Sequence, residues 1–165
     1  MANRTYNQFA GTLERKVVKL FAKILWTDPG SGVVPTLVTS EVLNSGTSPV
    51  TINPSQGFES LTDNTGGEFV LTLGANNGGV PTYDPYVRLL NVSGAAIYPS
   101  APGASVQDQL ITVGVVTNNV NGSAGNPSLT LVTLGADSSG NPVNAVLVDN
   151  TVLLLEITLS NTTAY

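Results

Sequence analysis

The sequence predicts a single all-β domain. From residue 27 onward, short segments rich in Val, Leu, Ile and Thr alternate with clusters of Gly, Pro, Asn and Ser, as is typical of strands separated by turns. The chain has 165 residues, of which 41% are hydrophobic and only 10% charged. A domain of this length buries roughly 70% of the surface that its unfolded chain exposes, so it can build a substantial core.

The opening segment, residues 13–26 (LERKVVKLFAKILW), fits two kinds of structure. Five apolar residues match the spacing of an amphipathic helix: Leu13, Val17, Leu20, Phe21 and Ile24. Alternate residues also share one face of a strand, with only the first polar: Lys16, Val18, Leu20, Ala22, Ile24 and Trp26. We favour the strand, because the segment holds β-branched and aromatic residues and the rest of the chain is β-rich.

Residues 28–73 are expected to form a long loop followed by a hairpin. Residues 28–57 are rich in Pro and Gly and predict a loop, with room for one short strand at residues 33–42. In residues 57–73, Phe69, Leu71 and Leu73 alternate along one strand after a turn-forming Asp-Asn-Thr-Gly-Gly sequence. This pattern predicts a β-hairpin.

Further strands are predicted at residues 87–92, 110–117, 129–134 and 151–159, with a turn at residues 137–142. The last strand lies in the sequence TVLLLEITLSN, which is apolar on both faces over several residues. A strand covered on both sides has this pattern. We therefore expect Leu153, Leu154, Leu155 and Ile157 to lie inside the fold or in a subunit interface.

Composition removes the common catalytic and metal-binding arrangements. The chain contains no His and no Cys, which excludes Ser-His-Asp and Cys-His nucleophiles, zinc sites built on these ligands and disulfides. No Gly-Lys-Ser/Thr triplet is present to bind a phosphate. We expect a protein that is not an enzyme and that holds no cofactor and no metal.

Two weaker chemical patterns have simpler explanations. Glu59, Asp63, Glu68 and Asp84 could supply the carboxylate pair of a glycosidase, but exposed hairpin charge is the better interpretation. Residues 137–149 space oxygen-bearing side chains as a calcium loop does, yet lack its Gly at position six and Glu at position twelve. A turn is therefore favoured there.

Charge is divided unevenly between the two ends of the chain. Residues 1–23 hold five Lys and Arg against one Glu, a balance of +4, whereas the remaining 142 residues hold one Arg against ten carboxylates, a balance of −9. Such asymmetry points to different surroundings for the two parts. Docking on an acidic protein surface ranks above nucleic acid or membrane-surface binding, and an ordinary solvated face is comparably plausible. We expect neither nucleic acid nor membrane as a partner.

The opening sequence MANRTYNQF lacks the pattern of a signal peptide, and no run reaches the roughly 20 apolar residues that cross a bilayer. We therefore expect the protein to be made in the cytoplasm and to remain in water.

Both ends of the sequence resemble a group of virion structural proteins of tailed bacteriophages. That group has an aromatic-Asn-Gln-Phe opening before Leu-Glu-Lys and a Val-rich strand, and ends in Leu-Leu-Leu-Glu-Ile followed by Leu-Ser-Asn-Ser/Thr-Thr. The chain departs from it where Arg15-Lys16 precedes Val17, since a Lys-Gly pair is usual there. The two stretches that carry the resemblance, residues 3–24 and 152–165, cover roughly a quarter of the chain. The matching residues in them are Tyr6, Asn7, Gln8, Phe9, Leu13, Glu14, Val17, Val18, Leu20, Phe21, Leu153 to Ile157 and Leu159 to Thr162.

The resemblance implies a capsid decoration or cement protein, with an antiparallel sandwich or jelly-roll-like barrel, an extended N-terminal arm and a homotrimeric state. It would belong to the virion and contact the major capsid protein or another virion protein. A neck, tail or fibre-base protein is the alternative within virions. A carbohydrate-binding β-domain that uses Tyr83, Tyr86 or Tyr98 is the alternative from another class.

Residues 1–12 are expected to form the arm and residues 13–165 the β-domain, with tethering contacts along residues 3–23. Tyr6 and Phe9 would pack on a neighbouring protein, because buried aromatic residues dominate the affinity of interfaces. Four basic residues would approach carboxylates of that partner and steer docking: Arg15, Lys16, Lys19 and Lys23.

Overall fold

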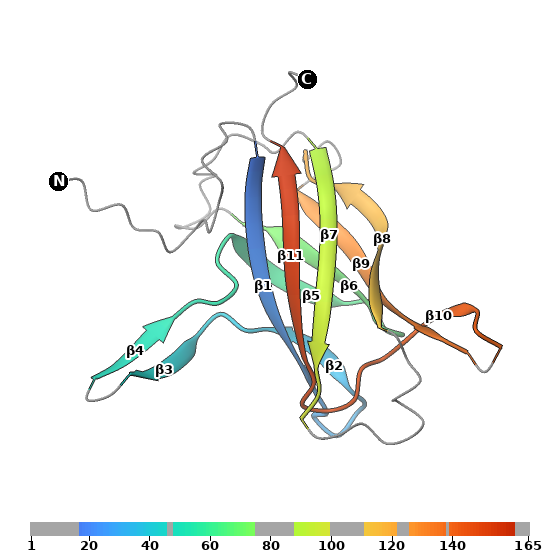
Figure 1. Cartoon of the computed structure of the whole chain (residues 1–165), viewed down its shortest axis with the longest axis horizontal. Helices are drawn as coiled ribbons and strands as arrows, with labels where there is room; N and C mark the ends of the chain where they lie inside the picture. The colour runs from blue at the N-terminus through green and yellow to red at the C-terminus, as the bar shows by residue number, and fades with distance from the viewer. Residues whose placement is uncertain are drawn as a thin grey trace.

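The computed structural model describes residues 17–45, 48–74, 88–99, 111–121, 126–137 and 139–160, and every regular element in these ranges is a β-strand. Two antiparallel sheets pack against each other, and a separate two-stranded hairpin projects from the body (Figure 1). This arrangement confirms the predicted all-β, sandwich-like domain.

The first sheet has the strand order β2-β1-β11-β7. Its strands are β1 (Val17–Thr27), β2 (Val34–Leu37), β7 (Arg88–Ile97) and β11 (Val152–Ser160). Residues 17–26 of the opening segment thus form a strand rather than a helix. β11 lies between β1 and β7 and pairs with both, so the last predicted strand is central, as expected.

The second sheet is built around β9 (Ser128–Ala136), which pairs with β6 (Glu68–Leu73) and β8 (Thr112–Asn119). β5 (Phe58–Asp63) pairs with β6, and the short β10 (Pro142–Asn144) pairs with the end of β9. The predicted hairpin at residues 57–73 is confirmed. Its turn holds Thr65, Gly66 and Gly67 at positive φ, a conformation that glycine adopts without steric cost.

Residues 28–57 differ from the predicted long loop. Besides β2, they contain β3 (Glu41–Ser45) and β4 (Ser48–Ile52), which pair with each other. Among the described strands, neither joins one of the two large sheets. We call residues 41–52 the arm hairpin; Figure 1 shows it extending away from the sandwich beside β1. The loop prediction was wrong because Pro and Gly also flank short hairpins.

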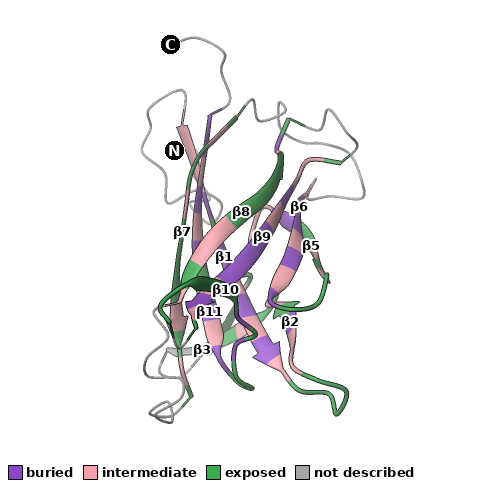
Figure 2. Ribbon diagram, turned by 90° about the vertical axis from the view of Figure 1, so that its right-hand side faces the viewer, coloured by how far each residue is buried: buried purple, intermediate pink, exposed green. Residues whose placement is uncertain are grey.

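The core lies between the two sheets, where alternate side chains of facing strands meet. Figure 2 marks the buried residues in purple along the ribbon. Trp26 and Phe69 connect the sheets through an edge-to-face contact with ring centroids 6.3 Å apart and planes at 83°. Burying a Leu or Ile side chain contributes about 1.5–3 kcal/mol, so this layer dominates stability. The most deeply buried apolar residues are Leu20, Ile24, Trp26, Phe69, Leu71, Leu129, Leu131, Leu153, Ile157 and Leu159.

The edges of the sandwich are closed by contacts between strands of different sheets, because β7 lies against β8 and β2 lies against β5. At Gly94 on β7, an added Cβ would stand 2.7 Å from Cγ2 of Val113 on β8. The missing side chain therefore allows the two sheets to approach at this edge.

The last strand is covered on one face only. Leu153, Leu155 and Ile157 are buried, but the side chain of Leu154 is 41% exposed. Leu154 therefore does not lie inside the fold of one chain, and for this residue the expectation rests on its second option, a subunit interface. When successive residues of a strand are all apolar, the sequence does not show which alternate set of side chains faces the core.

Candidate interaction surface

The side of the first sheet that faces away from the core carries a mixed surface, which we call the outer face. Alternation along β1, β11 and β7 determines its members, and the strand register sets them in rows. It comprises Lys19, Phe21, Lys23 and Leu25 of β1, Val152, Leu154, Glu156 and Thr158 of β11, and Asn91, Ser93, Ala95 and Ile97 of β7.

Both lysines of the outer face form ion pairs within the chain. Lys19 Nζ lies 2.6 Å from Glu156 Oε1, and Lys23 Nζ lies 2.7 Å from Glu41 Oε1. These side chains are partly exposed, and such surface pairs contribute about 0–1 kcal/mol each. Their larger effect is that the charge of each lysine is already balanced on the outer face.

The predicted partner-binding residues divide into two groups. Tyr6, Phe9, Arg15 and Lys16 lie outside the described residues, as does the predicted arm at residues 1–12. Lys19 and Lys23 lie in β1, within the sandwich, so the tethering segment predicted for residues 3–23 cannot extend through them. That part of the prediction was wrong, because residues from Val17 onward pair with β11.

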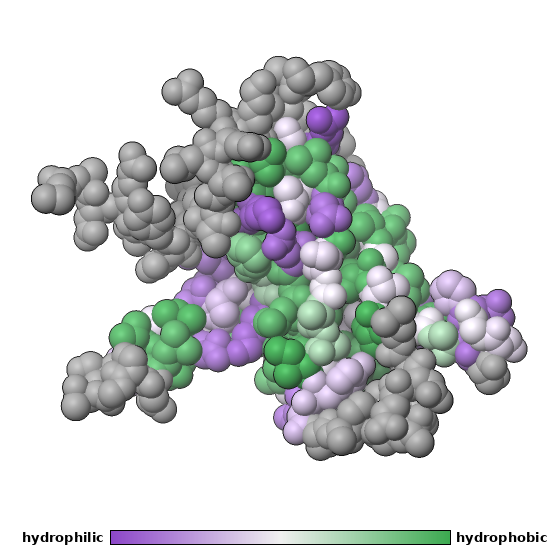
Figure 3. All heavy atoms as spheres, viewed as in Figure 1, coloured by the Kyte–Doolittle hydropathy of each residue, from purple (hydrophilic) through white to green (hydrophobic). Residues whose placement is uncertain are grey.

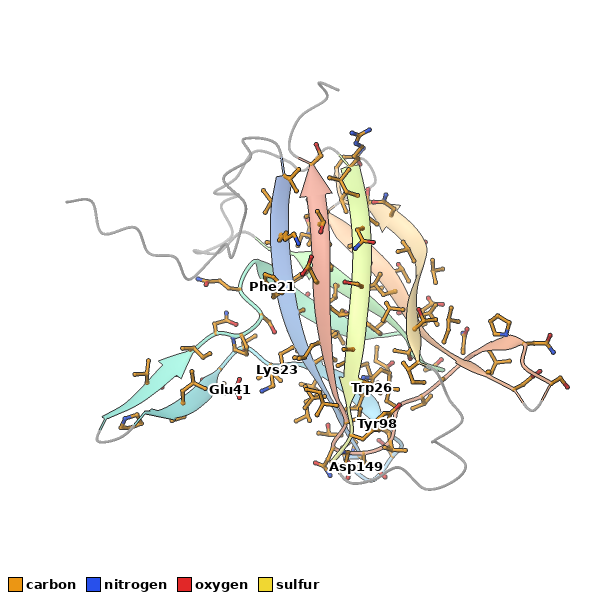
Figure 4. All side chains as sticks on the ribbon, viewed as in Figure 1. Phe21, Lys23, Trp26, Glu41, Tyr98 and Asp149 are labelled. Atoms are coloured by element: carbon orange, nitrogen blue, oxygen red, sulfur yellow. The ribbon has the colours of Figure 1, made fainter. Side chains whose placement is uncertain are left out.

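Apolar side chains fill the rest of the outer face. Phe21 is 40% exposed, Leu154 41% and Ile97 53%, and Leu25 and Val152 are partly exposed. The register places Leu25 opposite Val152 and Val152 opposite Ile97, so these residues form one row across three strands. Figure 3 shows hydrophobic atoms over this side, and Figure 4 places Phe21 and Lys23 on β1.

The arm hairpin exposes a second apolar surface. Leu43 is 45% exposed and Val50 49% on one side of the hairpin, and Val42 is 57% exposed on the other side. Leu43 is paired with Val50 across the two strands. Sequence analysis missed these residues because it assigned the segment to a loop. The sequence Glu-Val-Leu-Asn-Ser of β3 shows no regular alternation of apolar and polar residues that would predict a strand.

The carboxylates considered for glycosidase chemistry belong to a hairpin turn and its strands. Asp63 accepts a hydrogen bond from the Thr65 N–H at 3.1 Å, and Glu68 accepts one from Asn64 Nδ2 at 3.0 Å. Glu59 is exposed on β5, and Asp84 lies outside the described residues. Two of the carboxylates thus stabilise the turn, which agrees with the interpretation as hairpin charge.

The suspected calcium loop is a turn closed by Asp137. Its carboxylate accepts hydrogen bonds from the N–H groups of Asn141 and Ser139, both at 2.8 Å, and from Asn141 Nδ2 at 3.1 Å. These bonds to Asn141 and Ser139 lower the pKa of Asp137. Across the described ranges, no three potential ligands among His, Cys, Asp and Glu come together to hold a metal ion.

Three polar atoms are buried near one end of the sandwich without a hydrogen-bond partner in the described part of the chain: Trp26 Nε1, the Tyr98 hydroxyl and Thr151 Oγ1. They come from the adjoining ends of β1, β7 and β11 (Figure 4). Desolvation raises the pKa of Tyr98. Trp26 is fully buried and so cannot stack on a nucleic acid base.

No protein-family model, curated protein or solved structure shows a match to this chain. The described residues contain no helix long and apolar enough to span a membrane.

Proposed function

We propose that this chain is a non-enzymatic structural protein of a bacteriophage virion, a decoration or cement protein that docks on the capsid as a homotrimer. One observation carries the proposal. Parts of the two stretches that resemble virion structural proteins, residues 17–24 and 152–160, are distant in sequence but pair with each other in β1 and β11, for example at Leu20 and Ile157. The described part of the resemblance therefore forms one pair of neighbouring strands at the centre of a sheet.

The character of the surface supports the same proposal. The outer face of this strand pair presents apolar side chains beside charge-balanced lysines, and such mixed surfaces are common in protein–protein contacts. The arm hairpin provides a further apolar element that extends from the body. Rigid strands that display exposed apolar residues suit attachment to another protein better than turnover of a small substrate.

A protein at another position in a virion would need the same kind of interaction surface. A neck, tail or fibre-base protein would differ from a decoration protein in copy number and in its location on the particle. The carbohydrate-binding alternative has less support. Tyr98 has a buried hydroxyl, which leaves only its partly exposed ring for a sugar contact, and Tyr83 and Tyr86 lie outside the described residues.

Cryo-electron microscopy of particles from a phage that encodes this chain tests the proposal. We expect density for the sandwich at many symmetry-related sites on the capsid surface, with three copies around each site. Purified protein should also co-sediment with capsids that lack it. Density restricted to the tail would replace the capsid position by the tail alternative, and absence from the particle would overturn the proposal.

A further inference from the structure

We propose that the arm hairpin of one copy packs against the outer face of a second copy of this chain. The contact joins two different surfaces. The arm hairpin contributes Leu43 and Val50, and the outer face contributes Phe21, Leu154 and Ile97. It involves only copies of this protein and can be tested without a capsid.

The arm hairpin lacks the support that two-stranded sheets require. An isolated two-stranded hairpin is marginally stable in water, and a third strand or a packed face is needed for stability. Among the described strands, β3 and β4 pair only with each other. Leu43 and Val50 remain about half exposed although they face each other across the pair. A surface that covers this side would stabilise the hairpin.

The apolar side chains of the outer face are also left uncovered. The apolar row of Leu25, Val152 and Ile97 crosses three strands, and Leu154 lies two residues from Val152 on the same side of β11. Monomeric soluble proteins rarely expose large contiguous apolar patches, and such patches mark interaction sites. A sheet face of this kind accepts a slender, apolar element laid across it.

The distribution of charged side chains favours the arm hairpin as the element that covers the outer face. Residues 42–52 contain no charged side chain. On the face, Lys19 and Lys23 are already paired with Glu156 and Glu41, so an uncharged segment can cover the apolar row without leaving an unpaired charge. An acidic partner would gain little there, because it would compete with the carboxylates already present.

The arm hairpin cannot contact the outer face of its own chain, because contacts at its base fix its direction. Its base is fixed beside β1 by the Lys23–Glu41 ion pair and by a 2.9 Å hydrogen bond from the Val38 N–H to the Lys23 carbonyl. From there the hairpin leads away from β11 and β7 (Figure 1). Leu43 lies on the same side of its strand as Glu41, so the apolar side of the arm continues the surface of the outer face.

A contact between two different patches of one chain can be exchanged reciprocally in a two-fold dimer, or it can repeat head to tail in a ring or a chain of copies. Both patches of every copy are then covered. Contacts of arm with arm, or of face with face, would cover only one of the two.

Cross-linking between single-cysteine variants tests the contact, because the natural chain has no cysteine. We would mix Leu43→Cys with Leu154→Cys and treat the mixture with a short bismaleimide. The expected product is a covalent heterodimer in clear excess over the dimers that each variant forms alone. Mixing Leu43→Cys with Val116→Cys is the matched control, since Val116 is 53% exposed on β8 of the other sheet.

Sedimentation equilibrium provides the second measurement. Leu43→Asp and Leu154→Asp should each weaken self-association about tenfold or more, because an unpaired carboxylate is costly to bury, whereas Val116→Asp should not. Circular dichroism should show an unchanged fold in all three. A monomeric natural protein, equal yields with Val116→Cys, or predominant dimers of one cysteine variant alone would overturn the proposal.

Discussion

The hydroxyl of Ser55 bonds both backbone groups of Lys23: it accepts from the N–H at 2.9 Å and donates to the carbonyl at 3.1 Å. Lys23 lies in β1 next to the segment paired with β2, whose register starts at Ile24. Ser55 is fully buried, and its hydroxyl provides the hydrogen bonds to Lys23 that the backbone of a neighbouring strand would otherwise provide. The turn after the arm hairpin is thereby fastened to the sandwich.

Replacing Ser55 by Ala should lower the free energy of unfolding by about 1–3 kcal/mol, because the N–H of Lys23 would lose this partner. Urea denaturation followed by circular dichroism measures the change. Ser60→Ala is the matched control, since Ser60 is exposed on β5, and should change the free energy by less than about 0.5 kcal/mol. Equal effects would show that the hydroxyl of Ser55 has no special role.

Gly67 should not tolerate a side chain. Its φ is +83°, and an added Cβ would overlap the backbone carbonyl of Ala145. Gly66 has φ +62° with open space around it, so Gly66→Ala should cost only the roughly 1–2 kcal/mol of left-handed backbone. Gly67→Ala should cost a further 1–3 kcal/mol or so from overpacking. Thermal melting of the two variants compares them directly, and a Gly66 variant that melts at or below the Gly67 variant would contradict the argument.

The strands of the sandwich were predictable where alternation and turn chemistry agreed. Phe69, Leu71 and Leu73 alternate after a turn that needs positive φ, and this hairpin appears as predicted. The arm hairpin was missed because its strands are five residues each and contain Pro and Asn. The pairing of Lys19 with Glu156 was also beyond sequence reasoning, since it depends on the register between two distant strands.

The central strand offers a test of which leucines form the core. Leu153→Ala and Leu155→Ala should each cost about 2–5 kcal/mol, because both side chains are buried and their removal leaves a cavity. Leu154→Ala, between them in the same strand, should change the free energy of unfolding of the monomer by less than about 1 kcal/mol. Chemical denaturation at low protein concentration isolates the monomer. A Leu154 variant as unstable as its neighbours would mean that the strand register is wrong.

The turn at Asp137 should respond to acid. Because its pKa is lowered in the folded state, the ionised carboxylate contributes stability above the unfolded pKa, which is about 3.9. This contribution is lost as the pH falls through the folded pKa. We expect the amide resonances of Ser139 and Asn141 to shift together below about pH 3.9 in an NMR titration. Asp137→Asn should remove that transition, and a carboxyl that titrates at or above its ordinary value would contradict the hydrogen-bond assignment.

Two buried threonines should respond in opposite directions to the same substitution. Thr133 Oγ1 lies within hydrogen-bond distance of the carbonyl oxygens of Gly67 and Ala145 and can donate its one proton to either, whereas Thr151 Oγ1 has no partner in the described part of the chain. Both residues are fully buried, and Val has nearly the same shape as Thr. Thr133→Val removes a donor from a buried carbonyl and should cost about 1–3 kcal/mol.

Thr151→Val removes a hydroxyl that was desolvated without compensation, so it should leave stability unchanged or raise it by up to about 1 kcal/mol. Urea denaturation of both variants measures the difference between the two sites, and the shared change in side-chain chemistry cancels in that comparison. Loss of stability in Thr151→Val comparable to that in Thr133→Val would show that the Thr151 hydroxyl is hydrogen-bonded in solution. The water or ligand atom that bonds this hydroxyl would then lie at the end of the sandwich where Trp26, Tyr98 and Thr151 are buried.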